Sequence, residues 1–342
     1  MQKKTTARTP RITIREVASD AGVSVAAVSK VLRDAYGVSE ALRAKVQASM
    51  EKLNYRPLAS ARGLRGRTYT VGLVFPDLRN PFFADIFAGV NSALERTQYQ
   101  AMQGISTSAD ALVEAMIDRQ MDGLILIGPN VELERLEEIS ARLPLVLIGH
   151  HGNSDLSFDT VNNDDQLGAR LAVRHLCENG HKKIAMLSLS APVSTVINQR
   201  ELGYRLEMTE QGLGTQMNIL RAPQVLRDVQ VAVRKLLSGK DRPDALFCWT
   251  DLMAFEAISV ATEMGLSIPG DLAIVGYDNT IFCEFWQNRL TSIVQSGEVL
   301  GLQATRLLIE RIEGREKSDH FVVTPRVVAR ASSAKASIAK DV

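Results

Sequence analysis

The residues of this sequence best suited to chemistry are polar and aromatic side chains that follow short apolar runs. In α/β folds the carboxyl ends of parallel strands meet at one edge of the sheet, and ligands bind there. A carboxylate, an amide and a guanidinium can hydrogen-bond the edge of a hydroxyl-rich ring, while aromatic rings cover its C–H face. Each residue alone is more often a helix cap or a salt-bridge partner, but their shared placement favours a ligand site. The candidates are Asp77, Asn80, Phe82, Phe83, Thr250, Asp251, Asp278 and Gln295, together with Arg200 in "INQRELGY".

No catalytic motif accompanies these residues. No G-x-G-x-x-G follows a strand-like run, and the sequence contains no Walker-A, H-E-x-x-H or G-x-S-x-G motif. The histidines of "GHHGN" (149–153) could suggest a metal, but neighbours at a strand end point to different sides, so we expect a surface loop. The sequence therefore predicts a binding protein with no catalytic residues, no metal and no cofactor.

The candidate residues must be positioned by the ends of strands in parallel sheets. The chain from Tyr69 onward has the sequence pattern of such sheets. Strand-like runs alternate with amphipathic helical stretches such as 164–179, which Gly180 closes. This alternation is typical of parallel sheets covered by helices, and its length predicts two subdomains with a cleft between them. The runs are "TVGLVF" (70–75), "GLILIG" (123–128), "LVLIG" (145–149), "KIAMLSL" (183–189), "DALFCW" (244–249), "LAIVGY" (272–277) and "TSIVQ" (291–295).

Composition restricts the class of protein further. The chain has 342 residues, of which 45% are hydrophobic and 23% charged, as is ordinary for a soluble protein of two or three domains. Its apolar runs are far shorter than a membrane helix, and the basic N-terminus lacks the apolar segment of a secretory signal. The three scattered cysteines fit a reducing compartment. We therefore expect a cytoplasmic protein with no membrane partner.

The net charge of +1 conceals an uneven distribution. Residues 1–67 contain 14 Lys and Arg against 5 Asp and Glu, so this segment carries +9 and the remainder of the chain carries −8. A small basic head on a larger acidic body indicates a polyanionic partner for the head. A solvated basic tail could carry the same charge. The sequence pattern within residues 1–67 is therefore needed to distinguish such a tail from a domain that binds a polyanion.

The head contains the start signals of helices. A capping box, T-x-x-E, opens the first helical stretch at Thr13, and Gly22 ends it. Ser24 and Ser39 are the expected caps of two further helices, and Pro57 is expected to end the last. A helix, a glycine-containing turn, a second helix and a supporting helix form the helix-turn-helix arrangement. The second and third helices are expected over roughly 25–33 and about 40–54.

The second helix of such an arrangement lies in the major groove of DNA. Its sequence, "VSVAAVSKVL" (23–32), lacks the bulky face of a core helix, as expected where base pairs approach. Val28 and Val31 are predicted to face the core of the head. A small apolar side chain can contact a thymine methyl group, and Lys30 can donate to a guanine edge. The predicted DNA-contacting residues are Ser24, Val25, Ala26, Ser29 and Lys30.

A short arginine-rich segment, "LNYRPLASARGLRGR" (53–67), follows the third helix. Within it "LASARGL" has room for only one or two helical turns, too few to be stable alone. Arg62 and its neighbours could contact DNA, which would supply the missing stability. The alternative is a flexible linker, which charge composition does not exclude.

Together these motifs resemble the LacI/GalR (lactose-repressor) family of bacterial transcription regulators. The resemblance implies an all-α helix-turn-helix DNA-binding head, a hinge helix, and an α/β core of two parallel-sheet subdomains like that of periplasmic sugar-binding proteins. It also implies a homodimer on pseudo-palindromic double-stranded operator DNA. The similarity covers about 13–333 and is carried by "TIREVASDAGVSVAAVSKVL", "LNYRPLASARGLR", "VGLVFPDLRNPFF", "ENGHKKIAML", "RELGY", "ALFCWTDLMAFEA", "GLSIPGDLAIVGYDN" and "LTSIVQ".

The resemblance also implies roles for individual positions. Val25, Ala26 and Lys30 fall on the positions that read the major groove, and Leu64 falls on the hinge leucine that wedges into a central base step of the minor groove. The effector contacts implied by the resemblance fall on Phe82, Phe83, Arg200, Thr250, Asp278 and Gln295. Gly149 stands where several relatives have an acidic effector contact, so the identity of the sugar does not carry over.

The predicted function is that of a transcriptional regulator that represses carbohydrate-metabolism genes, with operator binding controlled by a small sugar-like effector in the core cleft. The alternative is the solute-binding protein of a sugar transporter, which shares the core but would need a signal peptide and would lack the basic head. An enzyme would need a catalytic constellation that the sequence lacks. The expected domains are 1–56 (helix-turn-helix), 57–68 (hinge), 69–334 (effector-binding core) and 335–342 (flexible tail).

Overall fold

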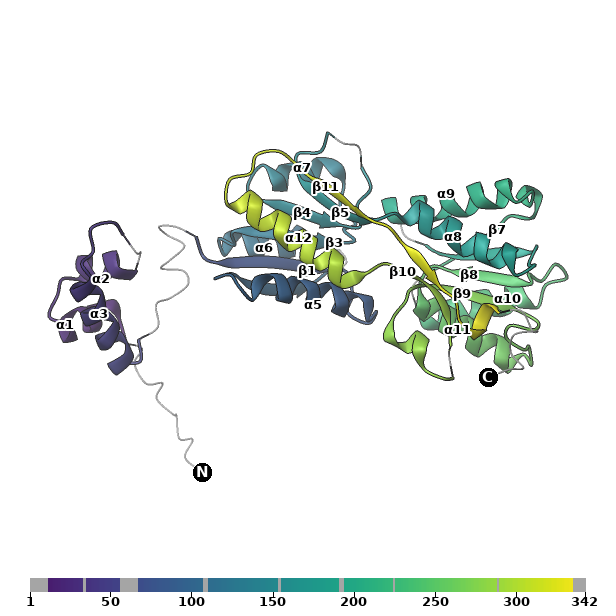
Figure 1. Ribbon diagram of the computed structural model, residues 1–342, viewed down its shortest axis with the longest axis horizontal. Coiled ribbons are helices and arrows are strands. Elements are labelled where there is room, and N and C mark those ends of the chain that lie inside the picture. Colours follow the sequence, from purple (N-terminus) through teal and green to yellow (C-terminus); the bar gives the residue numbers. More distant parts are fainter. Residues whose placement is uncertain are drawn as a thin grey trace, which may run out of the picture. The chain divides into compact units, whose positions relative to one another are not determined.

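The chain divides into two compact units, a head within Met1–Thr68 and a core within Tyr69–Val342 (Figure 1). The computed structural model describes residues 12–32, 35–55, 67–106, 110–152, 155–190, 194–223, 225–287 and 289–334. The predicted hinge residues Arg62 and Leu64, and the tail 335–342, lie outside these ranges. Within them, no helix has the length and apolar character needed to span a membrane.

The first two helices of the head begin at the predicted caps. α1 (Ile14–Asp20) opens with the capping box, in which the Glu16 carboxylate accepts the backbone N–H of Thr13 at 2.6 Å. α2 (Val25–Leu32) starts after Ser24, whose hydroxyl accepts a backbone N–H from the first turn at 3.1 Å. These contacts satisfy donors that a helix start would otherwise leave unpaired.

The third helix, α3 (Glu40–Lys52), holds the other two in place. It is shorter than predicted, because the chain leaves the helix at Leu53 and Asn54 takes a left-handed conformation (φ 49°). The prediction that Pro57 ends this helix is therefore wrong. Ser49 donates to the Asp20 carboxylate at 2.8 Å, which ties α3 to the end of α1. The buried core of the head consists of Val17, Ala18, Ala21, Val28, Val31 and Val46.

The core unit is built from two lobes through which the chain passes in turn. The first lobe contains β1 (Thr70–Phe75), α5 (Phe82–Leu94), β2 (Gln100–Ile105), α6 (Asp110–Asp118), β3 (Gly123–Ile127), α7 (Leu133–Ser140), β4 (Leu145–Ile148), β5 (Asp159–Asn163), α12 (Gly297–Ile312) and β11 (His320–Val323). The second lobe contains α8 (Asp165–Glu178), β6 (Ile184–Leu189), α9 (Thr195–Glu210), η1 (Gly214–Gln216), β7 (Asn218–Ala222), α10 (Leu226–Leu237), β8 (Ala245–Cys248), α11 (Asp251–Glu263), β9 (Ala273–Asp278), η2 (Ile281–Glu284), β10 (Thr291–Val294), β12 (Arg326–Val328) and η3 (Ala331–Ser333).

Each lobe has one sheet at its centre. Within the described residues, the sheet of the first lobe has the strand order β11-β5-β4-β3-β1-β2 and is parallel throughout. The sheet of the second lobe has the order β12-β10-β9-β8-β6-β7 and is antiparallel only where β12 meets β10. The predicted core of two parallel-sheet subdomains is confirmed.

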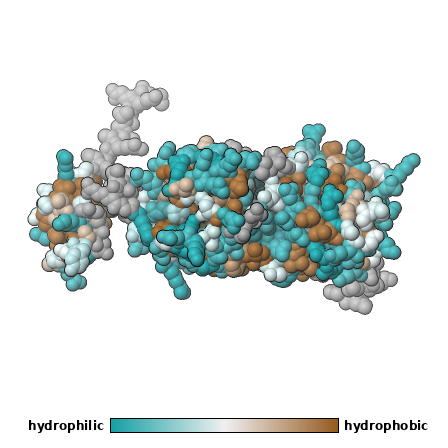
Figure 2. Space-filling model, turned by 90° about the horizontal axis from the view of Figure 1, so that it is seen from above, coloured by the Kyte–Doolittle hydropathy of each residue, from teal (hydrophilic) through white to brown (hydrophobic). Residues whose placement is uncertain are grey.

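Helices cover both faces of each sheet because strand side chains alternate between the faces. In the first lobe, Leu73 and Ile125 face α5 and α12, whereas Val74 and Leu124 face α6 and α7. In the second lobe, α10 and α11 cover one face, and α8 and α9 cover the other. The resulting surface of the core is mostly hydrophilic, with scattered apolar patches (Figure 2).

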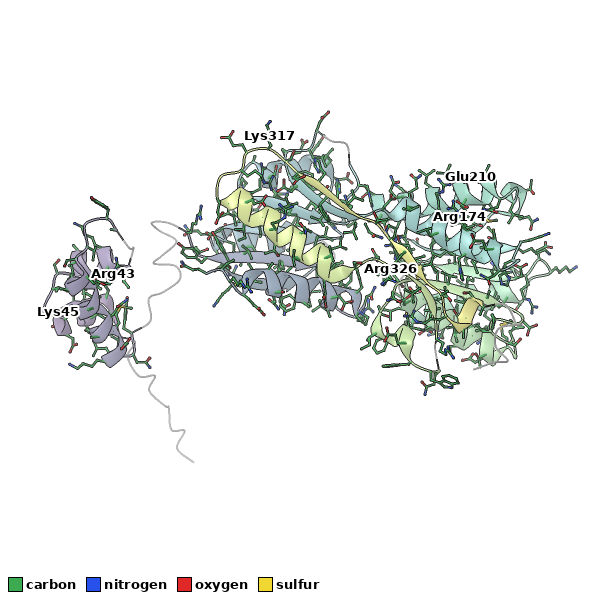
Figure 3. The ribbon with its side chains drawn as sticks, in the orientation of Figure 1. Arg43, Lys45, Arg174, Glu210, Lys317 and Arg326 are labelled. Atoms are coloured by element: carbon green, nitrogen blue, oxygen red, sulfur yellow. The ribbon has the colours of Figure 1, made fainter. Side chains whose placement is uncertain are left out.

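Paired helices approach closely at glycines. A Cβ atom on Gly301 of α12 would lie 2.0 Å from the backbone oxygen of Ile86 in α5, so only glycine fits there. The α8–α9 pair is also joined by ion pairs, since Arg174 donates to Glu207 at 2.8 Å; Arg174 and Glu210 of this pair are labelled in Figure 3. Such rigid pairs hold the strand ends on which the candidate ligand residues lie.

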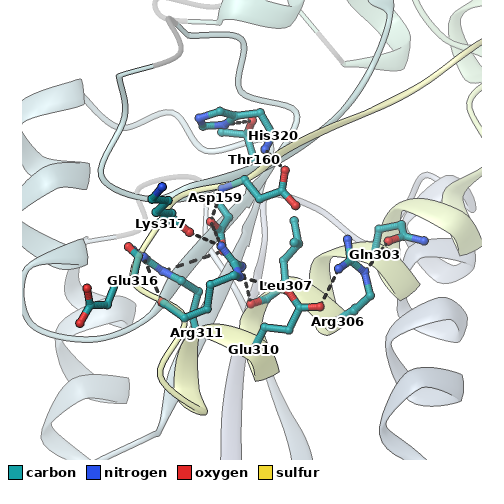
Figure 4. A network of polar contacts seen from close by, with 12 residues as sticks. Asp159, Thr160, Gln303, Arg306, Leu307, Glu310, Arg311, Glu316, Lys317 and His320 are labelled. Carbon is teal, nitrogen blue, oxygen red and sulfur yellow. Dashed lines mark hydrogen bonds and ion pairs between the residues drawn. The ribbon is translucent and has the colours of Figure 1, made fainter.

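The chain passes between the lobes after β5, after β10 and after β11, and β11 and β12 follow one another from the first lobe into the second (Figure 1). A buried carboxylate, Asp159 at the start of β5, anchors the segment that leads into β11 (Figure 4). It accepts Arg315 at 2.6 Å and the backbone N–H of Asp319 at 2.8 Å, which fixes the segment between α12 and β11. The segment that leads to the last passage is therefore held within the first lobe.

Candidate functional site

The exposed face of α2 carries the residues predicted to contact DNA. Ser24, Val25, Ala26 and Lys30 are exposed, Val25 to 42%, and Ser29 is partly exposed. Val28 and Val31 point into the core of the head, as predicted. Small side chains on this face leave room for base edges to approach, and Arg43 and Lys45 of α3 add positive charge to the same unit (Figure 3).

A cavity of about 320 Å³ lies between the two lobes of the core. Residues from both lobes line it, and all six expected effector contacts are among them. Of the other strand-end candidates Asn80 lines it too, whereas Asp77 and Asp251 do not. Its apolar wall includes Phe82 and Phe83 of α5, whose ring centroids are 5.9 Å apart. The sequence-predicted residues, which are far apart along the chain, therefore meet around one space.

Asp278 is a buried acid of the cavity. Its carboxylate accepts the amide of Asn80 from the first lobe at 2.7 Å and the amide of Gln295 from the segment after β10. The side chain is buried, and burial together with the nearby charge of Asp251 raises the pKa of Asp278 to about 8. Asp278 is thus a buried hydrogen-bonding group that joins the two lobes, and its carboxylate does not cap the turn that follows β9.

Arg200 forms the cationic part of the cavity. Its Nε donates to Asp165 at 2.7 Å and its Nη1 donates to the carbonyl of Trp249 at 2.8 Å. The guanidinium lies 3.6 Å from the ring centroid of Tyr277 and 4.2 Å from that of Trp249. Burial opposes its charge, but the Asp165 carboxylate outweighs that effect and raises the pKa of Arg200. The guanidinium is therefore charged, buried and held in one orientation.

Two further candidates combine local and cavity roles. Thr250 accepts the backbone N–H of Met253 at 3.3 Å, so it caps α11 while it also lines the cavity. Gln295 donates its amide N–H to Asp278, which leaves its oxygen for other partners. Asp77, which the sequence places on the same loop as Asn80, pairs with Arg79 instead.

Several cavity residues were not predicted from the sequence. Asn163, at the end of β5, donates to the Tyr277 hydroxyl at 3.1 Å, and among the described residues its buried Oδ1 has no hydrogen-bond partner. Asp165 begins α8 and is fully enclosed. Trp249 follows β8 and lines the cavity beside Arg200. A rule that looked at the last residue of every strand and at the residues after it, including polar strands, would have found all of these.

The segment "GHHGN" forms, over its described residues 149–152, a loop after β4, as predicted, but its two histidines also make contacts inside the core. His150 and His151 are both partly buried, and their rings point to different partners, as expected at a strand end. The His150 ring packs against Phe158, and the His151 ring lies 2.7 Å from the Asp165 carboxylate. Among the described residues no cluster of His, Cys, Asp and Glu could hold a metal. The loop is therefore a contact between the lobes.

The charges around the cavity nearly cancel. Arg200 is paired with Asp165, and the raised pKa of Asp278 favours its neutral form around pH 7. Hydroxyl, amide and carboxyl groups remain to hydrogen-bond a ligand between apolar walls, which is the usual composition of a small-molecule site. This arrangement is suited to binding a neutral, hydroxyl-rich molecule.

The head and the cavity together define a class of protein: a DNA-binding regulator with a two-lobed, ligand-binding core. Residues 13–57 match the family model for bacterial regulatory proteins of the lacI family, and residues 173–333 match that of the periplasmic binding protein-like domain. The chain therefore belongs to the lacI family of bacterial regulatory proteins.

Relatives with the same organisation match nearly the whole chain. The catabolite control protein A of Priestia megaterium is 33% identical over 95% of this chain and 99% of its own length. The HTH-type transcriptional repressor PurR of Photobacterium profundum is 31% identical over 94% of this chain and 98% of its own length. Among solved structures, the transcriptional regulator CelR in complex with cellobiose is 28% identical, covers 94% of this chain and 100% of its own, and has a TM-score of 0.71.

Proposed function

We propose that the protein represses carbohydrate-metabolism genes by binding operator DNA through α2, and that a small hydroxylated effector in the core cavity controls this binding. The observation that carries the proposal is the cavity itself, in which Asp278 and Arg200 of one lobe face Phe82 and Phe83 of the other. The same chain carries a basic head with an exposed recognition helix. Nothing in this function requires a catalytic step.

On the DNA side, Val25, Ala26 and Lys30 would contact base edges in the major groove. Ser24 and Ser29, at the start and middle of α2, would hydrogen-bond nearby phosphates, because contacts of this kind fix the register of a helix on the duplex. Arg62 would bind the backbone and Leu64 would wedge into the minor groove at the centre of the operator. These assignments follow the division into a head of 1–56, a hinge of 57–68, a core of 69–334 and a tail of 335–342.

On the effector side, we assign a neutral sugar or sugar derivative. Asp278 and Gln295 would hydrogen-bond ring hydroxyls, Arg200 would bridge to another oxygen, and Phe82 or Phe83 would cover a ring face. The near-neutral charge balance of the cavity supports an uncharged ligand over an anionic one. The relative CelR, whose structure contains cellobiose, supports the sugar class.

We further propose that the protein acts as a homodimer in the cytoplasm. A pseudo-palindromic operator presents two equivalent half-sites, which a two-fold symmetric dimer matches. The second lobe offers an apolar surface for pairing in and after η2, where Ile281 is 64% exposed and Trp286 is 74% exposed. Phe282 and Phe285 extend this surface. Aromatic side chains exposed together mark interaction sites more often than isolated ones do.

Two measurements on the full-length protein test the proposal. Selection of bound sequences from random double-stranded DNA should return a motif with two related half-sites, and a single half-site or no motif would contradict dimeric operator binding. A melting-temperature screen should identify a stabilising ligand among monosaccharides, disaccharides and polyols, with purines and sugar phosphates as the contrasting classes. Stabilisation by a sugar phosphate alone would overturn the neutral assignment.

A further inference from the structure

We infer that His151 is a positioning residue that fastens the two lobes across the cavity and, through Asp165, holds Arg200 in place. The role of Arg200 toward a ligand rests on the proposed function, whereas the fastening of the lobes does not. His151 does not line the cavity, and its sequence context predicts only a surface loop.

The contacts of His151 cross from one lobe to the other. The residue follows β4 in the first lobe, and its ring Nε2 lies 2.7 Å from Oδ2 of Asp165, the first residue of α8 in the second lobe. Its backbone N–H donates to the hydroxyl of Thr195, the first residue of α9, at 2.8 Å. One residue of the first lobe is thus bound to the starts of two packed helices of the second.

Asp165 transmits this contact to the cavity. One carboxylate oxygen accepts the His151 ring and the other accepts Arg200 Nε at 2.7 Å. The side chains of Asp165 and Arg200 are each less than 5% exposed, and that of His151 is 19% exposed. A buried carboxylate with both oxygens occupied has one orientation, so the His151 ring restricts where Asp165 can hold the guanidinium.

The position of this contact complements a second polar link across the cavity. Asn80 of the first lobe donates to Asp278 of the second, while His151 reaches Asp165 beside Arg200. Asp278 and Arg200 are therefore each tied to the opposite lobe, Asp278 directly and Arg200 through Asp165. Opening of the cleft must break both links.

Trp249 provides a readout of this link that needs neither ligand nor DNA. It is 8% exposed, lies beside Arg200 and accepts a hydrogen bond from it. The only other tryptophan in the chain is Trp286, which is 74% exposed, so Trp286→Phe leaves Trp249 as the single fluorophore with a conservative change. Acrylamide quenching of Trp249 in this full-length background then reports how far the cleft opens.

His151→Ala should raise the quenching constant of Trp249 severalfold and shift its emission to longer wavelength. Loss of a hydrogen bond to a buried charge shifts a closed–open equilibrium by about ten- to a hundredfold. His151→Asn, which is too short to reach Asp165, should behave in the same way, and His151→Gln, which restores a donor of similar reach, should recover the closed value. Circular dichroism identifies variants that fold.

The matched control is His175→Ala. His175 lies on α8 and bonds the Ser333 hydroxyl at 2.8 Å within the second lobe, so its loss removes a similar histidine contact without touching the link between the lobes. The Trp249 quenching constant of His175→Ala should equal that of the Trp286→Phe background. The inference is overturned if folded His151→Ala or His151→Asn protein leaves Trp249 quenching unchanged, or if His175→Ala raises it equally. Either result leaves the ligand screen and the proposed function untouched.

Discussion

Replacing Asp278 by Asn separates a ligand-binding role from a structural one. A buried ligand hydroxyl that loses its hydrogen-bond partner costs about 1–3 kcal/mol, whether or not that partner is charged. Asp278→Asn should therefore weaken binding of the stabilising sugar by about ten- to a hundredfold. The head is a separate unit, so operator binding without ligand should be retained. The protein should occupy its operator but no longer respond at the usual effector concentration.

The effect of Asp278→Asn on stability follows from the two amides that the carboxylate accepts, those of Asn80 and Gln295. An asparagine offers one oxygen, so one of the two donors loses its partner, at a cost of about 1–3 kcal/mol. Replacing the buried acid by a neutral amide has the opposite effect and stabilises the protein, because burial disfavours the charged form of the acid. We therefore expect the melting temperature to change by only a few degrees.

Asp251→Asn is the matched control for this experiment. Asp251 holds the turn after β9 by accepting the Thr280 backbone N–H at 2.7 Å and the Ser292 hydroxyl at 2.6 Å, but it does not line the cavity. The Asp251→Asn variant should be less stable than the wild type but should bind the ligand with the same affinity. Calorimetric titration and melting curves on the same preparations measure both quantities. Unchanged ligand affinity in Asp278→Asn, with a large fall in melting temperature, would show that Asp278 is only structural.

Four further outcomes are expected. Lys30→Ala should cost about 1–3 kcal/mol on the preferred operator and relax selection at one base pair per half-site, which sequence selection with both proteins would reveal. Leu64→Ser should weaken operator binding strongly yet leave salt-dependent nonspecific binding intact; equal losses of both would assign Leu64 a structural role. Trp286→Glu should shift the dimer to monomer in analytical ultracentrifugation, and an unchanged dimer would place the interface elsewhere. Because the native pKa of Asp278, about 8, lies above the ordinary 3.8, its contribution to stability should be complete below pH 4 and be lost as pH rises toward 8; Asp278→Asn should flatten this part of the melting profile, and parallel profiles would contradict it.

The sequence predicted the strands whose burial comes from apolar side chains. β1, β3, β4, β6, β8, β9 and β10 lie within or overlap the predicted runs. β5, "DTVNN", was not predicted, because its polar side chains are buried by hydrogen bonds to distant residues: Asp159 binds Arg315, and Asn162 binds the backbone of His150. No local pattern contains that information. The edge strand β2 was missed because its exposed side chains show no clear alternation.

The candidate site was predictable to the extent that strand ends position it. Asp278 and Gln295 follow adjacent parallel strands, so their proximity follows from topology. The link between His151 and Asp165 could not be predicted, because it joins residues of different lobes whose separation depends on how the lobes close. The shorter α3 was missed for a local reason, since Asn54 is able to adopt the left-handed conformation that ends a helix.

The claim that a ligand in the core cavity controls DNA binding is tested most directly by operator affinity. Fluorescence anisotropy of the selected operator, titrated with full-length protein, should be measured with and without a saturating concentration of the sugar that most raises the melting temperature. The wild-type dissociation constant should change by about 5- to 150-fold, the usual range of coupling between two sites. Asp278→Asn should need a sugar concentration about ten- to a hundredfold higher to produce the same change. An operator affinity that stays constant in the wild type when the cavity is saturated would contradict the account.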